Sequence, residues 1–177
     1  MAVALGAILA LIYVKRSGHV HAPDSIAHFA LSPAPAALPD VAFSDALGHR
    51  HTLAEFKGHY VLLNLWATWC APCVKELPSL AKLQKTMGNR LVVVPVDVGR
   101  GEALDAAKFL QEHGAGSLQV YLDSDIALVR ALKAYGLPTT VLIDPKGREI
   151  GRAAGDADWG APSSVRYLQA ITARASS

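Results

Sequence analysis

The sequence has little cysteine and no run of charge of one sign. Its 17 lysines and arginines are scattered among 15 acidic residues, and the formal net charge is only +2. This pattern argues against a nucleic-acid-binding protein, which concentrates basic residues on one face. A chain of 177 residues that is 51% apolar can bury one good core, so we expect a single folded domain.

The first residues lack charge altogether. Met1 to Val14 carries no charged side chain, and Lys15 and Arg16 follow at once. The run is shorter than the about 20 residues that a membrane-spanning helix needs, and no basic residue precedes it. We predict a membrane anchor or signal segment over residues 1–16, with an anchor favoured over a cleaved signal and a buried cytosolic helix as the third alternative. No cysteine lies nearby, which excludes a lipoprotein anchor.

Proline and alanine dominate the next stretch. Residues 17–38 hold Pro23, Pro33 and Pro35, which break any regular hydrophobic period. This composition is typical of a linker, so we predict a linker over residues 17–38 and a folded domain over residues 39–177. A tether after an export segment would place that domain outside the cytoplasm, where thiols are under oxidising pressure and a cysteine pair is seldom accidental.

Apolar runs and helical periods alternate from residue 40 onward. The pattern predicts a hairpin over residues 41–53, strands over 60–66, 91–98, 119–122, 139–143 and 148–153, and helices over 71–87, 102–113, 124–135 and 163–173. Strands that alternate with helices before a closing hairpin and helix indicate a mixed sheet sandwiched by helices, which is an α/β fold.

Both cysteines stand in the motif WATWCAPC, residues 66–73. Cys70 falls where a predicted strand ends, and Cys73 lies in the first turn of the following helix. At this spacing two side chains share a helix face and can close a short disulfide ring. The free N–H groups and dipole at the helix start favour a thiolate at Cys70, so Cys70 is the predicted nucleophile and Cys73 the resolving thiol. Pro72 fits this first turn because its missing N–H costs little there.

A structural disulfide and a metal site fit the cysteine pair less well. A stabilising disulfide gains little from so short a loop. A metal site would need two further ligands, and most histidines lie in the predicted linker and hairpin, namely His19, His21, His28, His49 and His51. A copper-binding chaperone could still combine the two thiols with His113, which keeps that alternative open.

More distant residues accompany the motif. Glu76 and Pro78 follow it, and Gly136-Leu137-Pro138-Thr139-Thr140 lies far downstream. With the stretches FSDALGHRHTLAEFKG, VLLNLWATWCAPCVKELPSL and YGLPTTVLIDPKGREIGRAAGDADW, these residues resemble the thioredoxin superfamily and, within it, the membrane-anchored TlpA, ResA and CcmG type of thiol-disulfide oxidoreductase. The resemblance covers residue 41 to the C-terminal helix. It implies a thioredoxin-like three-layer α/β/α sandwich with a mixed central sheet, an extra N-terminal β-hairpin and a helix-containing central insert over residues 101–118.

The resemblance also implies roles for residues around the motif. It makes Cys70 the attacking and Cys73 the resolving cysteine, and it makes Pro138 a cis-proline that faces them. In this family the backbone beside that proline pairs with a bound client segment like an added strand. Leu137 and Thr139 are therefore predicted substrate-binding residues.

Asn64 marks a departure from ordinary thioredoxins, which carry a buried acid six positions before the first cysteine to assist the resolving thiol. Asparagine cannot take a proton. The TlpA type shares this change and carries an acid shortly after the motif, which matches Glu76. Glu76 is thus the third predicted catalytic residue, although without the resemblance an exposed helical glutamate would be the simpler interpretation. Trp69, Ala71 and Pro72 are predicted to contact substrate.

These observations lead to a functional hypothesis. We expect a periplasmic, membrane-tethered protein-disulfide reductase that uses the Cys70–Cys73 dithiol and no other cofactor. The resemblance implies apo-cytochrome c or copper-site assembly proteins of cytochrome oxidase as clients, and a membrane electron donor for re-reduction. Neither Ala71 nor Pro72 can hydrogen-bond through its side chain to a thiolate, which favours a reductase over an oxidase.

Several alternatives remain beside the reductase. A general disulfide oxidant or a copper-binding chaperone could use the same fold. A thiol peroxidase could use Cys70 against peroxide, but the Pro-Thr-x-x-x-Cys setting that by resemblance is typical of peroxiredoxins is absent. An adaptor domain with an inert disulfide would show no exchange with dithiols.

Overall fold

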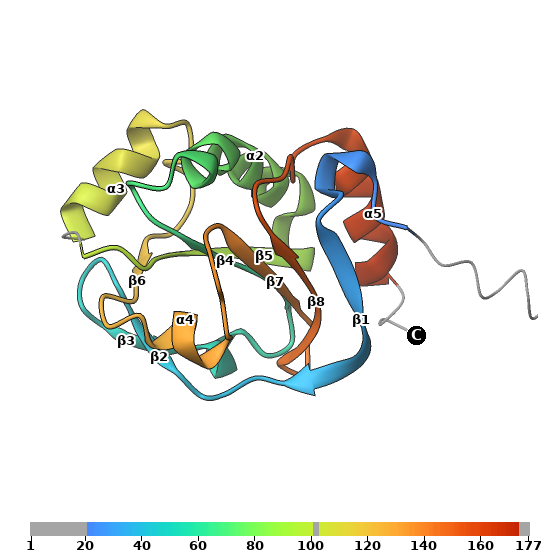
Figure 1. Ribbon diagram of the computed structural model, residues 1–177, viewed down its shortest axis with the longest axis horizontal. Coiled ribbons are helices and arrows are strands. Elements are labelled where there is room, and N and C mark those ends of the chain that lie inside the picture. Colours follow the sequence, from blue (N-terminus) through green and yellow to red (C-terminus); the bar gives the residue numbers. More distant parts are fainter. Residues whose placement is uncertain (1–20, 101–102, 174–177) are drawn as a thin grey trace, which may run out of the picture.

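The computed structural model describes residues 21–100 and 103–173, which form a mixed β-sheet with helices on both faces (Figure 1). The sheet has the strand order β1-β8-β7-β4-β5-β6-β2-β3. Its strands are β1 Phe29–Ala37, β2 Ala42–Asp45, β3 Arg50–Thr52, β4 Tyr60–Trp66, β5 Leu91–Asp97, β6 Tyr121–Leu122, β7 Thr139–Ile143 and β8 Arg148–Ala154. The helices are α2 Ala71–Met87, α3 Ala103–Glu112, α4 Ala127–Ala131 and α5 Pro162–Ala173, with 3-10 turns η1 Asp24–Ile26, η2 Leu53–Phe56 and η3 Gly88–Arg90.

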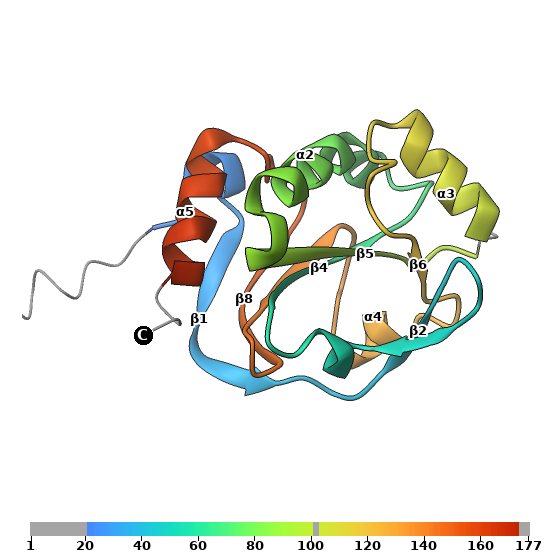
Figure 2. The same cartoon turned by 180° about the vertical axis from the view of Figure 1, so that it is seen from behind.

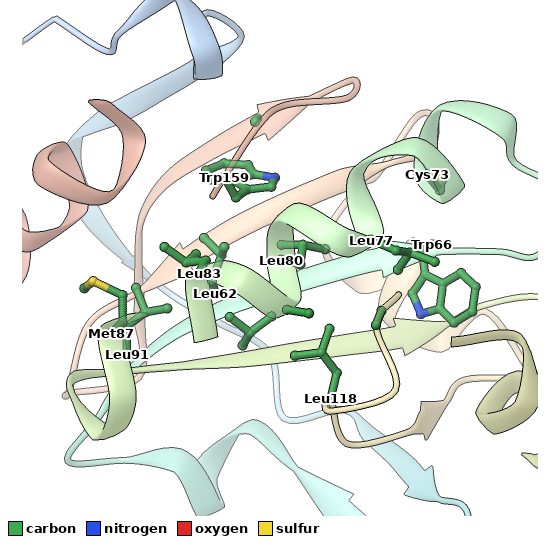
Figure 3. Close-up of a cluster of buried hydrophobic side chains, with 14 of the residues drawn as sticks. Leu62, Trp66, Cys73, Leu77, Leu80, Leu83, Met87, Leu91, Leu118 and Trp159 are labelled. Atoms are coloured by element: carbon green, nitrogen blue, oxygen red, sulfur yellow. The ribbon is translucent and has the colours of Figure 1, made fainter. Parts of the chain in front are cut away.

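The central strand β4 is buried along its whole length because helices cover both of its faces. It pairs in parallel with β5 and antiparallel with β7. Leu62 and Trp66 belong to the core under α2, α3 and α5 (Figure 3), whereas Leu63 and Leu65 pack with α4 on the other face. Seen from behind, α4 again lies across the sheet from α2 and α3 (Figure 2). The predicted α/β sandwich is therefore confirmed.

Helix α2 presents one apolar side to the sheet. Leu77, Leu80 and Leu83 are fully buried at helical spacing, and Cys73 lies on the same inner side. Ala71 and Pro72 at the start of the helix face solvent. The orientation that buries the leucines thus also turns one cysteine inward.

Strand β1 contradicts the described part, residues 21–38, of the linker that we predicted over residues 17–38. It pairs antiparallel with β8, from Phe29 opposite Ala153 to Ala37 opposite Arg148. Pro33 fits because β1 is an edge strand and this residue falls in the register shift between Leu31 and Ala36, where the ladder is interrupted. Proline content was therefore misleading here, since an edge strand tolerates it.

Buried aromatic contacts hold this N-terminal strand in place. The ring of Phe29 meets Trp159 and Tyr167 edge-on, at centroid distances of 6.0 and 6.1 Å. Gly151 on β8 lies under that ring, and a Cβ there would come within 2.6 Å of the Phe29 Cζ. A glycine is needed at this position because the aromatic ring crosses the strand so closely.

The remaining predictions have mixed outcomes. The hairpin over residues 41–53 is present as β2 and β3, and the predicted insert carries α3. Helix α4 spans only Ala127–Ala131 instead of residues 124–135, because Ile126 and Lys133 both adopt a left-handed backbone with φ of 51°. The predicted anchor over residues 1–16 lies outside the described residues. None of the described helices is long and apolar enough to cross a membrane.

Candidate active site

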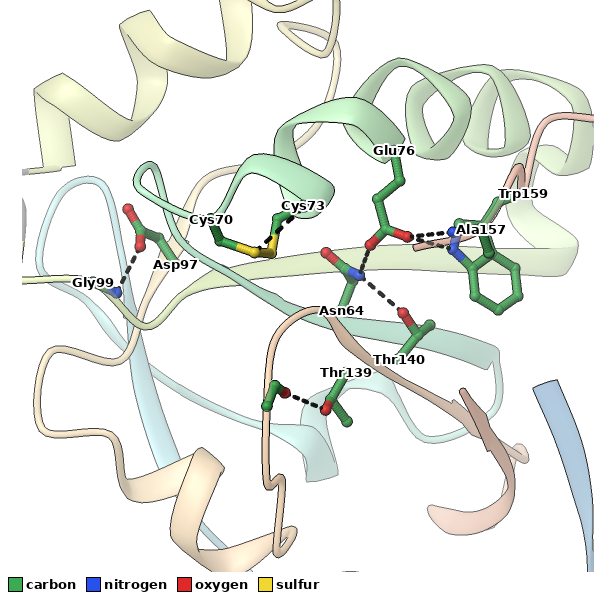
Figure 4. Close-up of a disulfide and its surroundings, with 11 residues drawn as sticks. Asn64, Cys70, Cys73, Glu76, Asp97, Gly99, Thr139, Thr140, Ala157 and Trp159 are labelled. Carbon is green, nitrogen blue, oxygen red and sulfur yellow. Dashed lines mark hydrogen bonds between the residues drawn. A yellow bond between two sulfur atoms is a disulfide. The ribbon is translucent and has the colours of Figure 1, made fainter. Parts of the chain in front are cut away.

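The two cysteines form a disulfide at the start of α2, with an S–S distance of 2.02 Å (Figure 4). After β4 ends, the Cys70 N–H donates to the carbonyl of Ala67 at 3.0 Å, which closes a tight turn into the helix. Cys70 is the N-cap, and its Sγ accepts a hydrogen bond from the Cys73 N–H at 3.3 Å. A backbone donor and the helix N-terminus therefore face this sulfur, and both favour a thiolate once the disulfide opens.

The two sulfurs differ in access. Cys70 is 5% exposed and is flanked by surface residues, with Trp69 73% exposed. Both cysteines belong to the core cluster that contains Leu77, but Cys73 is fully buried (Figure 3). An incoming client from solvent can thus approach Cys70, and the geometry favours Cys70 as the attacking and Cys73 as the resolving cysteine.

The loop before β7 brings distant residues to the same end of the sheet. The Leu137–Pro138 peptide bond is cis, as the resemblance implied. Thr139 pairs with Leu65 near the end of β4, which places the loop beside the cysteine motif. Two segments far apart in the sequence, the cysteine motif after β4 and the loop before β7, therefore meet at one end of the sheet.

The polar groups of this loop are not equally available to hydrogen-bond a client. Thr139 is 3% exposed, and its hydroxyl donates to the Gly136 carbonyl at 2.7 Å, so its side chain supports the loop. The Pro138 carbonyl accepts a hydrogen bond from Gly155. In contrast, the Leu137 N–H and C=O have no hydrogen-bond partner within the described part of the chain. Leu137 is therefore the predicted binding residue whose main chain is open to a client strand.

Glu76 is buried on the inner side of α2, with only 2% exposure. Its carboxylate accepts hydrogen bonds from Asn64 Nδ2 at 2.6 Å, the Ala157 N–H at 3.1 Å and Trp159 Nε1 at 3.3 Å (Figure 4). Burial raises the pKa of Glu76 from 4.5 to about 7, and the three hydrogen bonds oppose only part of that increase. Glu76 thus carries a carboxyl that exchanges its proton near neutral pH, one helical turn from Cys73.

Asn64 links this carboxyl to the sheet. Its Nδ2 also donates to Thr140 Oγ1 at 2.9 Å, so both amide protons are engaged. The Asn64 Oδ1 is buried without a hydrogen-bond partner among the described residues, and in Figure 4 it lies on the side of the amide toward the cysteines. Asn64 cannot take the proton itself, but it orients the group that can.

Sequence reasoning missed Trp159 as part of this site. Its indole is fully buried and donates to Glu76 from the loop after β8. The available signal was a tryptophan in a polar stretch, DADWG, where an aromatic ring is unusual. Its partner is 83 positions away in sequence, which no local pattern reveals.

The structure gives the copper-chaperone alternative no support. Within residues 21–100 and 103–173, no group of three or more His, Cys, Asp or Glu side chains could hold a metal ion. His113 stacks on Phe109 with ring centroids 3.9 Å apart, and its Nδ1 lies 2.8 Å from the Phe109 carbonyl oxygen. The candidate third ligand is thus engaged at the end of α3.

The chain is similar in sequence to a known protein family and to known proteins. Residues 35–149 match the family model described as the AhpC/TSA family. The chain is 36% identical over 118 residues to the thiol-disulfide oxidoreductase ResA of Bacillus subtilis (strain 168), which covers 66% of this chain and 65% of that protein. It is 34% identical over 110 residues to ResA of Geobacillus kaustophilus (strain HTA426), with 62% of each covered. The chain thus spans less than two thirds of the length of these two relatives.

Solved structures show the same fold. A crystal structure from Chlorobium tepidum, assigned as a thiol:disulfide interchange protein DsbE, superposes with a TM-score of 0.66 at 27% sequence identity. The match covers 82% of this chain and 98% of that one. The thioredoxin-like fold implied by the sequence is therefore confirmed.

Proposed function

This chain belongs to the AhpC/TSA family, and we propose that it is a thiol-disulfide oxidoreductase that reduces disulfides in client proteins. One observation carries the proposal. Cys70 keeps 5% exposure beside the exposed Trp69, Cys73 is fully buried, and the carboxyl of Glu76 lies one turn further along with a pKa raised to about 7. The names of the relatives, thiol-disulfide oxidoreductase ResA, support the same reaction type.

The reaction proceeds by two exchanges. In the reduced protein the Cys70 thiolate attacks one sulfur of the client disulfide. That S–S bond breaks, the second client sulfur leaves and takes a proton, and a mixed disulfide joins Cys70 to the client. Cys73 then gives its proton to Glu76 and attacks Cys70, which releases the remaining client thiolate. The released client thiolate takes up that proton from Glu76, so with the proton taken from solvent in the first exchange the client gains two electrons and two protons, and the Cys70–Cys73 disulfide forms.

The surroundings of Cys70 support a reductant. The thiolate would accept a hydrogen bond from the Cys73 N–H, and the side chains of Ala71 and Pro72 add no donor. A strongly oxidising dithiol needs a thiolate that is stabilised further. An extended client segment would pair with the open main chain of Leu137, beside the exposed surface of Trp69, Ala71 and Pro72.

We also propose the setting in which the protein works. Residues 1–16 would anchor the domain to the periplasmic side of the cytoplasmic membrane. Apo-cytochrome c or copper-site assembly proteins would be the clients, and a membrane dithiol donor would restore the reduced state. Deletion of residues 1–16 should move the protein from the membrane to the soluble fraction, and persistence in the membrane fraction would contradict the anchor.

The test is the reduction potential of the protein, measured by tryptophan fluorescence in dithiol redox buffers. A value near or below about −270 mV would support a reductant, whereas a value near −120 mV would make the protein a disulfide oxidant. Insulin reduction should be lost in Cys70→Ser. Full activity of that variant, or peroxide consumption without disulfide reduction, would contradict the proposed function.

A further inference from the structure

A cavity of about 1020 Å³ opens beside the exposed ring of Trp69. Its walls come from the loop after β5, the segment before α4 and two residues of α4, and the lining includes Trp69, Val98, Arg100, Asp125, Ile126 and Arg130. The Val98 N–H donates to the Trp66 carbonyl at 2.9 Å, which ties the wall to the strand that leads into the cysteine motif. The cavity thus adjoins Trp69, the residue that directly precedes Cys70.

Two apolar side chains are exposed in this cavity. Trp69 is 73% exposed and Ile126 is 39% exposed. Ile126 has a φ of 51°, a left-handed conformation that is unfavourable for a β-branched residue. The Asp123 carboxylate holds the segment in place by accepting the N–H groups of Ala127 at 3.0 Å and Leu128 at 2.7 Å. A strained isoleucine that remains exposed contributes little to the core, and such strain often marks a ligand contact.

The same cavity carries positive charge. Arg100 and Arg130 line it, against Asp125 as the acidic lining residue. Neither arginine forms an ion pair with a carboxylate of the described residues, and Arg130 donates instead to the Asp125 backbone carbonyl. Guanidinium groups without an acidic partner are ready to receive a carboxylate in bidentate geometry.

Building on the proposed function, we infer that this cavity binds the client polypeptide beside its reactive disulfide and selects segments with an acidic side chain next to an apolar one. The apolar side chain packs between Trp69 and Ile126, and the carboxylate pairs with Arg100 and Arg130. Trp69 directly precedes Cys70, and an extended chain advances about 3.3 Å per residue. The selected side chains therefore lie within a few residues of the client cysteine.

The test uses three disulfide peptides that differ only in one pair of residues near a cysteine, Leu-Glu, Leu-Gln or Leu-Lys. For the full chain at low ionic strength, we expect kcat/KM to be about tenfold higher for the Glu peptide than for the Lys peptide, and salt should shrink the difference. The double variant Arg100→Glu/Arg130→Glu should reverse the order. Hydroxyethyl disulfide, which is small and neutral, should be reduced equally by both proteins.

A matched control carries the same change in net charge elsewhere. Lys85→Glu/Arg90→Glu alters exposed residues near the start of β5, whereas the cavity follows the end of that strand. This variant should keep the preference for the Glu peptide. Equal rates on the Glu and Lys peptides, or a preference that survives Arg100→Glu/Arg130→Glu, would overturn the inference and leave the proposed function standing. Failure to reduce any disulfide, hydroxyethyl disulfide included, would instead overturn the proposed function.

Discussion

The two sides of the disulfide differ in exposure and in hydrogen bonding, although only Ala71 and Pro72 separate the cysteines. On the outer side, Trp69, Ala71 and Pro72 are exposed, and Trp69 lines the cavity. The inner side, formed by Cys73, Glu76, Asn64 and Trp159, is buried and hydrogen-bonded across helix, sheet and loop. Substitutions on the outer side can therefore alter client binding without disturbing the fold. On the inner side, in contrast, the protonation state of Glu76 affects the stability of the folded protein.

The carboxyl of Glu76 shows how strong this coupling is. Its pKa rises from 4.5 to about 7 on folding because the charged form is taken out of water. A shift of this size corresponds to about 3 kcal/mol between the protonated and ionised forms of the folded protein. The folded protein therefore favours protonated Glu76, and the stability from this group is lost as pH rises through the raised pKa.

The largest expected effect is on the inner side, at Trp159. Trp159→Ala removes a fully buried ring that contacts Phe29 and donates to Glu76. We expect a loss of about 3–5 kcal/mol in the free energy of unfolding, measured by urea denaturation. Trp159→Phe keeps most of the ring and should cost clearly less. A loss below about 1 kcal/mol in Trp159→Ala would contradict the view that the inner side supports the fold.

The second prediction concerns the pH dependence of the inner side. Between pH 4 and 8, the free energy of unfolding of the oxidised protein should fall by about 3 kcal/mol relative to Glu76→Gln. In that variant Asn64 can turn its amide so that its oxygen accepts from the glutamine. Glu112→Gln, an exposed change on α3, is the control and should follow the wild type. A wild-type curve parallel to that of Glu76→Gln would show that Glu76 does not titrate as proposed.

On the outer side, we expect Trp69→Ala to reduce activity on protein clients while leaving stability almost unchanged. Its ring is largely exposed, so the free energy of unfolding should change by no more than about 0.5 kcal/mol. The kcat/KM for a protein disulfide should fall about tenfold because the client loses an aromatic contact surface. Reduction of hydroxyethyl disulfide serves as the reference reaction. A stability loss close to that of Trp159→Ala would remove the distinction between the two sides.

The smallest effect is expected at His51 in the β2–β3 hairpin, whose contribution to the pH dependence of stability can be compared with that of Glu76. A hydrogen bond to Glu55, with Asp45 adding to it, raises the pKa of His51. Stability from this group is present at pH values below the unfolded pKa and is lost as pH rises through the folded pKa. His51→Gln should remove a slope of the same sign as that of Glu76 but of smaller size, because solvent screens the pair. Urea denaturation across pH checks this, and a larger slope than that of Glu76 would contradict it.

The features that could be predicted from the sequence are those set by neighbouring residues along the chain. The apolar run of β4 and the leucine spacing of α2 placed Cys70 at a strand-to-helix turn. Recognition of the family added the cis-proline loop and Glu76. Long-range packing explains the rest, since Trp159 reaches Glu76 only after the loop behind β8 folds over α2. The left-handed backbone of Ile126, which shortens α4, could not be predicted because the residue is neither a glycine nor an asparagine.

The most direct test of the division between the two sides is to trap the mixed disulfide. Reduced Cys73→Ser and Cys70→Ser proteins are each mixed with a disulfide-bonded peptide, and the covalent adducts are identified by mass spectrometry under non-reducing conditions. We expect Cys73→Ser to accumulate an adduct on Cys70, because the more accessible sulfur attacks and no resolving thiol releases the peptide. Cys70→Ser should form almost none. An equal yield of adduct on Cys73 in Cys70→Ser would contradict the account, since the buried sulfur would then meet clients as readily as the accessible one.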